Sequence, residues 1–330
     1  MTAADPLPPT GTSAPVPHLG WTWAPAWPID LRAVLGSLRR GGGDPCLRIG
    51  SDGVWWATRS AGSPVTMHLR VDARERAVRV DAWGDGVAEL PDVLPRILGA
   101  DDDVSGFVPH HDVIAQAWRR FSGWRVPCTG RVLESLAPAV LEQKVTGGEA
   151  RDAWRTLVRA HGDRAPGPTP VPMFAPPTAA AWSRIPEWEW YRAGVTPQRR
   201  RTLVRAASVG RRLDGLESST APDAAQVAGN VLQELPGIGP WTAAEVRQRA
   251  LGDPDTVSVG DFHLPLQVSY GLTGERCARG DDARMLELLE PYRGHRYRVQ
   301  RLLELAGVSA PRRGPRYSPA ARQAVLRGHP

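Results

Sequence analysis

The chain has 330 residues, of which 42% are apolar and 23% charged, an ordinary composition for a globular protein. The net charge of +6 and the isoelectric point of about 9.8 favour a polyanionic partner. There is no apolar run of about 18 residues, which excludes a membrane-spanning helix. The three cysteines are too scattered for paired metal ligands, a disulfide framework or an iron–sulfur cluster with four ligands from this chain. We therefore expect a protein of the reducing cytoplasm.

The first hundred residues predict a tail followed by an α+β unit. Residues 1–19 are rich in Pro, Thr and Ser, lack the basic start and apolar core of a secretory signal, and are predicted to be disordered. Residues 20–100 predict a small accessory domain in which one helix precedes an antiparallel meander and a second helix follows it and covers one face of the sheet. Its expected helices are 29–40 and 89–99, and its expected strands are 46–50, 53–60, 65–72 and 77–83.

Residues 101–310 change character to amphipathic helices that are joined by short breaks containing Pro and Gly. The segment 163–179 is too rich in proline for a regular element and is predicted to be a loop, and residues 311–330 are predicted to be a basic, irregular tail. The predicted helices are 110–121, 130–145, 148–162, 178–185, 196–213, 223–235 and 282–307. The fold class is therefore α+β, with a small antiparallel sheet before a mainly helical part.

One segment, "ELPGIGPWTAAEV" at 234–246, breaks this helical pattern sharply and then restarts it. Gly237 and Gly239 permit backbone angles with positive φ and the close approach of another molecule, and Pro240 suits the first turn of a helix. Thr242 and the alanines after it let the second helix pack tightly on the first. The result would be a helix, a tight hairpin and a second helix whose N-terminus forms an anion site.

A helix corner that only packs would explain the hairpin by itself. A second segment, "DPDTVSVGDFHLP" at 253–265, argues against that simpler interpretation, because it places Asp261 20 residues beyond Trp241. Together, "LPGIGPWTA" and "SVGDFHL" resemble the helix-hairpin-helix DNA glycosylase superfamily, and in particular its 3-methyladenine DNA glycosylase II branch. The segments "LAPAVLEQKVTGGEA", "GVTPQRRRTLVRAA" and "LLEPYRGHRYRVQRLL" resemble further helices of that branch.

This resemblance covers roughly residues 20–310 and implies a glycosylase core of two helical subdomains after the accessory domain. It implies that the hairpin backbone holds phosphates of the damaged strand without reading the sequence of bases. It also implies a Na⁺ or K⁺ ion on the main-chain carbonyls of Gln233, Leu235 and Gly237. No other cofactor is expected. The residues expected to form the DNA-binding hairpin are Leu235, Pro236, Gly237, Ile238, Gly239, Pro240 and Thr242.

Asp261 is the predicted catalytic residue. A base inside a duplex is out of reach, so a glycosylase must flip it out of the stack. Cleavage of the N-glycosidic bond then builds positive charge on the deoxyribose, which a fixed carboxylate stabilises while it orients water toward C1′. The alternative role for Asp261 is the N-cap of the helix that begins with "FHLPLQV".

Trp241 occupies the position at which bifunctional members of the superfamily carry their Schiff-base lysine. An indole cannot form an imine, so the resemblance implies base excision without AP lyase activity. Trp241 is also expected to line the base pocket, where it would attract a cationic purine; a core tryptophan is the alternative. Glu245 and Arg301 match positions that are aromatic in many relatives, so they are expected to make the pocket more charged, either by pairing with each other or by binding a base edge.

Lys144, the only lysine, matches the side chain that relatives insert into the gap left by the flipped base. Contact with a phosphate is the alternative. Gln143 would bind the orphaned base, or would simply lie on a helix surface. Seven arginines between Arg293 and Arg316 would form either a phosphate-binding face or a solvated basic surface.

The sequence thus predicts a monofunctional DNA glycosylase of base excision repair, a hydrolase that removes alkylated, 3-methyladenine-type purines. Its partner would be double-stranded DNA with damaged bases, and it would act as a monomer associated with the nucleoid. Two alternatives stay open. One is a glycosylase for deaminated or bulky purine lesions, and the other is a catalytically inactive, lesion-sensing DNA-binding protein.

Overall fold

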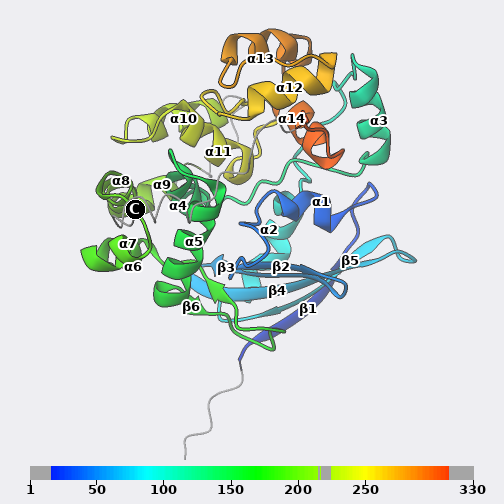
Figure 1. The fold of residues 1–330 in the computed structure, drawn as a ribbon. Helices are drawn as coiled ribbons and strands as arrows, with labels where there is room; N and C mark the ends of the chain where they lie inside the picture. Colours follow the sequence, from blue (N-terminus) through cyan, green and yellow to red (C-terminus); the bar gives the residue numbers. More distant parts are fainter. Residues whose placement is uncertain (1–15, 215, 217–223, 312–330) are drawn as a thin grey trace, which may run out of the picture.

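The structure, a computed structural model, describes residues 16–214, 216 and 224–311. It consists of an antiparallel sheet, two helices above it, and two groups of helices farther along the chain (Figure 1). The α+β fold class is therefore confirmed. In the described part of the chain, every helix is too short or too polar to cross a membrane. Most of the two predicted tails, 1–19 and 311–330, lies outside the described residues.

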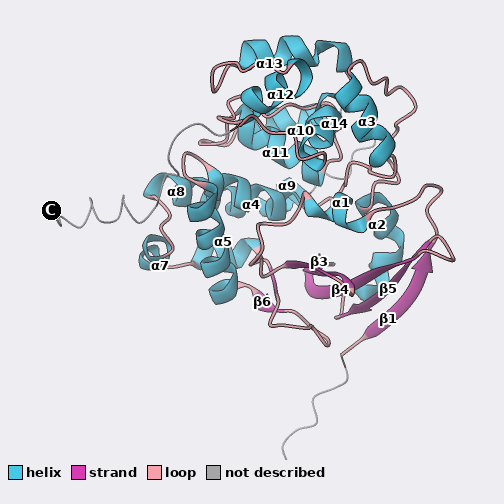
Figure 2. Ribbon diagram, turned by 45° about the vertical axis from the view of Figure 1, so that its right-hand side comes forward, coloured by secondary structure: helices cyan, strands magenta, loops and turns pink. Residues whose placement is uncertain are grey.

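The sheet has five strands in the order β1-β5-β4-β3-β2. Strands β2 to β5 form the predicted meander, in which Trp56 pairs with Met67 and Met67 with Ala82, so that these three side chains share the buried face. The strands are β1 (His18–Trp23), β2 (Leu47–Gly50), β3 (Gly53–Ser60), β4 (Ser63–Asp72) and β5 (Ala77–Trp83). Helices α1 (Leu31–Gly36) and α2 (Leu90–Ile97) lie between the sheet and one of the two groups of helices, and the other group lies beside them (Figure 2).

Strand β1 is a correction, because it begins at His18 inside the predicted tail and pairs with β5, far away in sequence. The predicted domain boundary at residue 100 is also crossed by packing. Trp124 and Tyr297 are fully buried in the cluster that the sheet forms with α1 and α2. The accessory unit therefore shares its core with the helical part.

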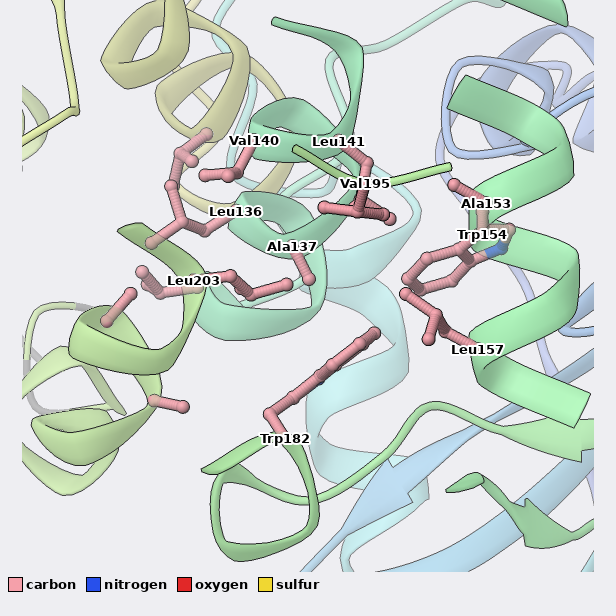
Figure 3. Close-up of a cluster of buried hydrophobic side chains, with 14 of the residues drawn as sticks. Leu136, Ala137, Val140, Leu141, Ala153, Trp154, Leu157, Trp182, Val195 and Leu203 are labelled. Atoms are coloured by element: carbon pink, nitrogen blue, oxygen red, sulfur yellow. The ribbon is translucent and has the colours of Figure 1, made fainter. Parts of the chain in front are cut away.

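The helical part contains two clusters of buried side chains, which agree with the two expected subdomains. In the first, side chains of α4 lie between those of α5 on one side and α8 on the other (Figure 3). Its helices are α4 (Val132–Glu142), α5 (Gly147–His161), α6 (Ala179–Arg184), α7 (Glu187–Arg192), α8 (Pro197–Ser208), α9 (Gly210–Asp214), α10 (Ala224–Gln233) and α11 (Pro240–Ala250). The second cluster joins α3 (Asp112–Arg120), α12 (Leu264–Thr273), α13 (Asp282–Leu289) and α14 (Arg296–Leu305).

Four local predictions need correction. The short helix α7 was not predicted, and the proline-rich loop contains a two-stranded ribbon, β6 (Asp163–Arg164) with β7 (Phe174–Ala175). The single helix predicted over 196–213 is divided into α8 and α9 at Val209. The single helix predicted over 282–307 is divided into α13 and α14 by a 3-10 turn at Glu290–Tyr292 and by Gly294, whose φ is +92°. Proline at the start of that turn and glycine after it explain the break.

Candidate active site

The predicted hairpin joins α10, which ends at Gln233, to α11, which begins at Pro240. Gly237 has φ +96°, and a Cβ atom there would lie 2.1 Å from the Thr202 Oγ1 atom of α8. A side chain is thus excluded at Gly237 by both backbone conformation and space. The tight turn that the sequence predicts is present, and α8 is packed directly against it.

Gly239 was also expected to make use of positive φ, but its φ is −97°. A Cβ atom there would meet nothing within 4 Å. Its glycine is therefore not required by the backbone, but it leaves the hairpin open on that side. Among the described residues, the amides of Gly237 and Gly239 have no hydrogen-bond acceptor. Free amides beside the N-terminus of α11 have the character of an anion site.

Not every residue of the hairpin is available to a ligand. Pro236, Gly237 and Pro240 are exposed, whereas Ile238 and Thr242 are 5% and 2% exposed. Ile238 belongs to the first helical cluster, and the Thr242 hydroxyl accepts a hydrogen bond from Gln143. The role of these two residues in the structure is to hold the hairpin in place.

Gln143 connects the end of α4 to the hairpin. Its amide nitrogen donates to the carbonyl oxygen of Gly237 and to the Thr242 Oγ1 atom, each at 2.9 Å. Both amide hydrogens are thereby used inside the protein, and only the carbonyl oxygen of the side chain remains for a base. The structure thus gives Gln143 a role in bracing the hairpin that the sequence did not predict.

Lys144 follows directly and is exposed, with φ +54° in the left-handed region. A non-glycine residue is strained there, at a cost of about 1 kcal/mol or more. Arg199 of α8 supports the same turn by donating to the carbonyl oxygen of Leu141 at 2.7 Å. The turn therefore presents the only lysine to solvent directly after a stretch of backbone that Gln143 and Arg199 anchor.

The carboxylate of Asp261 is held by three donors. The amides of His263 and Leu264 donate to its Oδ1 atom at 2.7 and 2.8 Å, and the Trp241 indole Nε1 atom donates to its Oδ2 atom at 3.0 Å. Asp261 thus caps the start of α12 and also contacts the first turn of α11. The two residues that the motif places 20 positions apart are brought together.

Asp261 keeps access to solvent, since it is only partly buried. Its Oδ1 atom has both lone pairs engaged by amides, whereas Oδ2 accepts one hydrogen bond and retains a second lone pair. An ionised carboxylate in this position can bind a water molecule or a developing positive charge. The capping role and a chemical role are therefore compatible.

Glu245 and Arg301 do not pair with each other, which corrects one of the two expectations for them. Glu245 is 7% exposed and binds Arg249 at 2.8 Å on its own helix. Arg301 forms an ion pair with Glu304, also on its own helix. The Arg301 Nε atom is buried and has no hydrogen-bond acceptor among the described residues.

The expected cation site consists of three carbonyl oxygens, two of which already accept a hydrogen bond. The Leu235 oxygen accepts from the Ile238 amide at 3.0 Å, and the Gly237 oxygen accepts from Gln143. A carbonyl oxygen has two lone pairs, so these atoms and that of Gln233 retain capacity for a monovalent ion. The described residues contain no cluster of three or more His, Cys, Asp and Glu side chains that could hold a metal.

The described arginines of the run from 293 to 316 are all paired. Arg293 binds Glu290, Arg296 binds Asp255, Arg298 binds Asp102, and Arg301 binds Glu304 as above. The expectation of a phosphate-binding face is thus unsupported for these four residues; the others lie outside the described residues.

Sequence reasoning missed the residues that surround Glu245. Ser258 donates to the Glu245 Oε1 atom at 2.8 Å, and Gln248 donates to Ser258 at 3.1 Å. The spacing of four residues between Glu245 and Arg249 is a pattern that could have indicated an ion pair on one helix. The partnership with Ser258 depends on how the following loop folds back, and sequence spacing does not show it.

Comparison with known proteins supports the resemblance. A curated protein of Mycobacterium tuberculosis, a probable bifunctional transcriptional activator/DNA repair enzyme AlkA, is 31% identical over 197 residues, 57% of this chain and 35% of that protein. The chain thus spans about a third of the length of that relative. No family model matches the chain.

Two solved structures show the same fold over most of their length. A 3-methyladenine DNA glycosylase from Archaeoglobus fulgidus has a TM-score of 0.68 and 17% identity, covering 87% of this chain and 98% of that one. The 8-oxoguanine glycosylase/lyase of Clostridium acetobutylicum has a TM-score of 0.64 and 11% identity, with 88% and 98% coverage. The chain therefore has the fold of the helix-hairpin-helix DNA glycosylase superfamily and resembles its 3-methyladenine DNA glycosylase II branch.

Proposed function

We propose that this chain is a monofunctional DNA glycosylase that removes alkylated purines from duplex DNA, with Asp261 as its catalytic residue. The observation that carries the proposal is the carboxylate of Asp261, which two amides and the Trp241 indole hold in one orientation with one lone pair free. This arrangement lies on the fold that the solved glycosylases share.

The hairpin would bind the DNA backbone. The amides of Gly237 and Gly239 would donate hydrogen bonds to a phosphate at the N-terminus of α11. A Na⁺ or K⁺ ion on the carbonyls of Gln233, Leu235 and Gly237 would add positive charge there. Lys144 would enter the gap left by the flipped base or bind a phosphate beside it. None of these contacts reads sequence, as a repair enzyme that must scan all DNA requires.

Asp261 would act on the flipped nucleotide. As the N-glycosidic bond lengthens, its electron pair leaves with the purine and positive charge develops on the deoxyribose, which the carboxylate stabilises. The free lone pair of Oδ2 would orient a water molecule toward C1′, and the product is an abasic site. An alkylated purine carries positive charge and leaves as a neutral base, so the protein needs no strong general acid.

Trp241 supports base excision without strand cleavage. Its indole lies beside the carboxylate, at the position where bifunctional relatives are expected to have the lysine that forms an imine. The single lysine of this chain lies elsewhere, on the exposed turn after α4. The product should therefore stay intact until alkali cuts it at the abasic site.

The test is a set of duplexes, each with one lesion: 3-methyladenine, 7-methylguanine, hypoxanthine, 8-oxoguanine or a bulky alkyl adduct. We expect release of the methylated purines, and cleavage of the strand only after alkali. Asp261→Asn is the informative variant, because asparagine keeps an oxygen for the two capping amides but removes the charge. It should fold normally and lose most of the activity.

Four results would overturn parts of the proposal. Release of hypoxanthine or the bulky adduct alone would show the other substrate class, and strand cleavage without alkali would show lyase activity. Tight binding to lesion DNA without release of any base would instead show a lesion sensor. Full activity of Asp261→Asn would remove Asp261 from the chemistry.

A further inference from the structure

The carboxylate of Glu245 is buried on α11, and both its oxygen atoms are engaged. Oε2 binds the Arg249 guanidinium at 2.8 Å, and Oε1 accepts the Ser258 hydroxyl hydrogen at 2.8 Å. A residue matched to a pocket position of relatives thus directs its charge into the protein. This arrangement bears on what Glu245 does for the proposed reaction.

Ser258 connects Glu245 to the backbone of Asp261. It is 1% exposed, and its carbonyl oxygen accepts the amide of Asp261 at 3.2 Å. Gln248 donates from one nitrogen to the Ser258 Oγ atom and to the Thr256 carbonyl oxygen, both at 3.1 Å. The Ser258 hydroxyl therefore donates once and accepts once, and the loop before Asp261 is fixed to α11 at two points, Thr256 and Ser258.

Arg249 fixes Glu245 in turn. Burial alone would lower the pKa of Arg249, but the Glu245 carboxylate and further acidic groups outweigh it and raise that pKa, so the guanidinium is charged. Its Nε atom donates to the carbonyl oxygen of Ser37, just after α1, at 3.1 Å. One ion pair thus links the unit that contains the sheet, helix α11 and the loop that carries Asp261.

We propose that Glu245 is a positioning residue that holds Asp261 in place through Ser258, and that it does not select the base. The inference rests on the proposed function, since Asp261 is the residue being positioned. The chain of contacts is short: one side-chain hydrogen bond from Glu245 to Ser258, and one backbone hydrogen bond from Ser258 to Asp261. The first link can be cut by substitution of a side chain, and the second can be followed by exchange of the Asp261 amide.

Ser258→Ala cuts the first link without unpairing a buried charge. One hydrogen bond to a charged acceptor contributes about 1.5–3 kcal/mol, so we expect the single-turnover excision rate to fall about 10- to 100-fold. Affinity for the lesion duplex should stay within about two-fold, because no group that contacts DNA changes. The ratio of rates between different lesions should not change.

Ser269→Ala is the matched control, because Ser269 is 2% exposed and its hydroxyl also donates one hydrogen bond, to the Glu275 carbonyl oxygen at 3.0 Å. It should leave the excision rate unchanged. Glu245→Gln keeps an oxygen for the Ser258 hydroxyl and should retain more activity than Glu245→Ala, with the same lesion ratio. Thermal unfolding of each variant checks that it is folded under the assay conditions.

Hydrogen exchange gives a readout that does not depend on activity. In Ser258→Ala the Asp261 amide should exchange faster, whereas the amides of α5 should be unaffected. A wild-type excision rate in Ser258→Ala, unchanged exchange at Asp261, or an altered lesion ratio in Glu245→Gln would each overturn the inference. If the wild-type protein released no base at all, the proposed function would fail, while the exchange result would still decide whether Glu245 holds the Asp261 loop.

Discussion

Trp241→Phe tests how much the orientation of Asp261 matters. The change keeps an aromatic ring on α11 and removes one hydrogen bond, from the indole Nε1 atom to Asp261 Oδ2 at 3.0 Å. A hydrogen bond to a charged group is worth about 1.5–3 kcal/mol, and the lower part of that range applies here because water can reach the partly buried carboxylate. A loss of about 1.5–2 kcal/mol in the transition state corresponds to a rate about 10- to 30-fold lower.

The assay is single-turnover excision with enzyme in excess over a duplex that contains one methylated purine. Trp188→Phe is the matched control, since Trp188 lies on α7 with 59% of its surface exposed. It should be indistinguishable from wild type. If Trp241→Phe excised at the wild-type rate, the indole hydrogen bond would have no role in holding the carboxylate, and the reasoning from its geometry would be refuted.

Three further substitutions test the hairpin and the buried ion pair between Asp102 and Arg298. Gly237→Ala should lower the free energy of unfolding by about 2–4 kcal/mol in urea titration, since its Cβ would strike Thr202 and its φ is +96°. Gly239→Ala should have the same free energy of unfolding as wild type, within about 1 kcal/mol. It should bind undamaged duplex about 10-fold more weakly, because a methyl group would occupy the open side of the hairpin. Equal affinity would show that this side of the hairpin does not contact DNA. Asp102→Asn should destabilise the protein by about 3–5 kcal/mol, because it leaves the guanidinium of Arg298, 0% exposed, without its carboxylate; a loss below about 1 kcal/mol would show that the pair contributes little.

The sequence was most informative where the local pattern and the fold agree. The hairpin, the helices beside it and the meander of β2 to β5 follow from turn residues and periodicity, and the structure contains them. Strand β1 was missed because its residues follow a proline-rich stretch and because its partner, β5, lies about sixty residues away. A strand stabilised by such a distant neighbour has little local pattern of its own.

At the candidate site, Asp261 and Trp241 were predicted because the segments around them resemble motifs of the glycosylase superfamily. The hydrogen bond between the two side chains was not predicted, since it depends on how the loop before α12 folds back onto α11. Gln143 and Glu245 were predicted to face DNA, and the structure gives both of them partners inside the protein. Which way a polar side chain turns depends on donors and acceptors from other segments, and these are known only once the chain has folded.

Capping and catalysis appeared from the sequence as rival roles for Asp261, but the geometry makes them cooperative. A carboxylate that must stabilise a developing positive charge is most effective when it is already oriented, since reorientation during the reaction would cost free energy. The two amides at the start of α12 occupy one oxygen and fix the plane of the group, while the indole fixes the other oxygen and leaves it a lone pair. The helix cap is thus the device that orients the carboxylate. It follows that Asp261→Asn should lose more activity than Trp241→Phe: the first loses the charge and, because its NH2 group faces the indole N–H, the indole hydrogen bond as well, whereas the second loses only that hydrogen bond and keeps the charge.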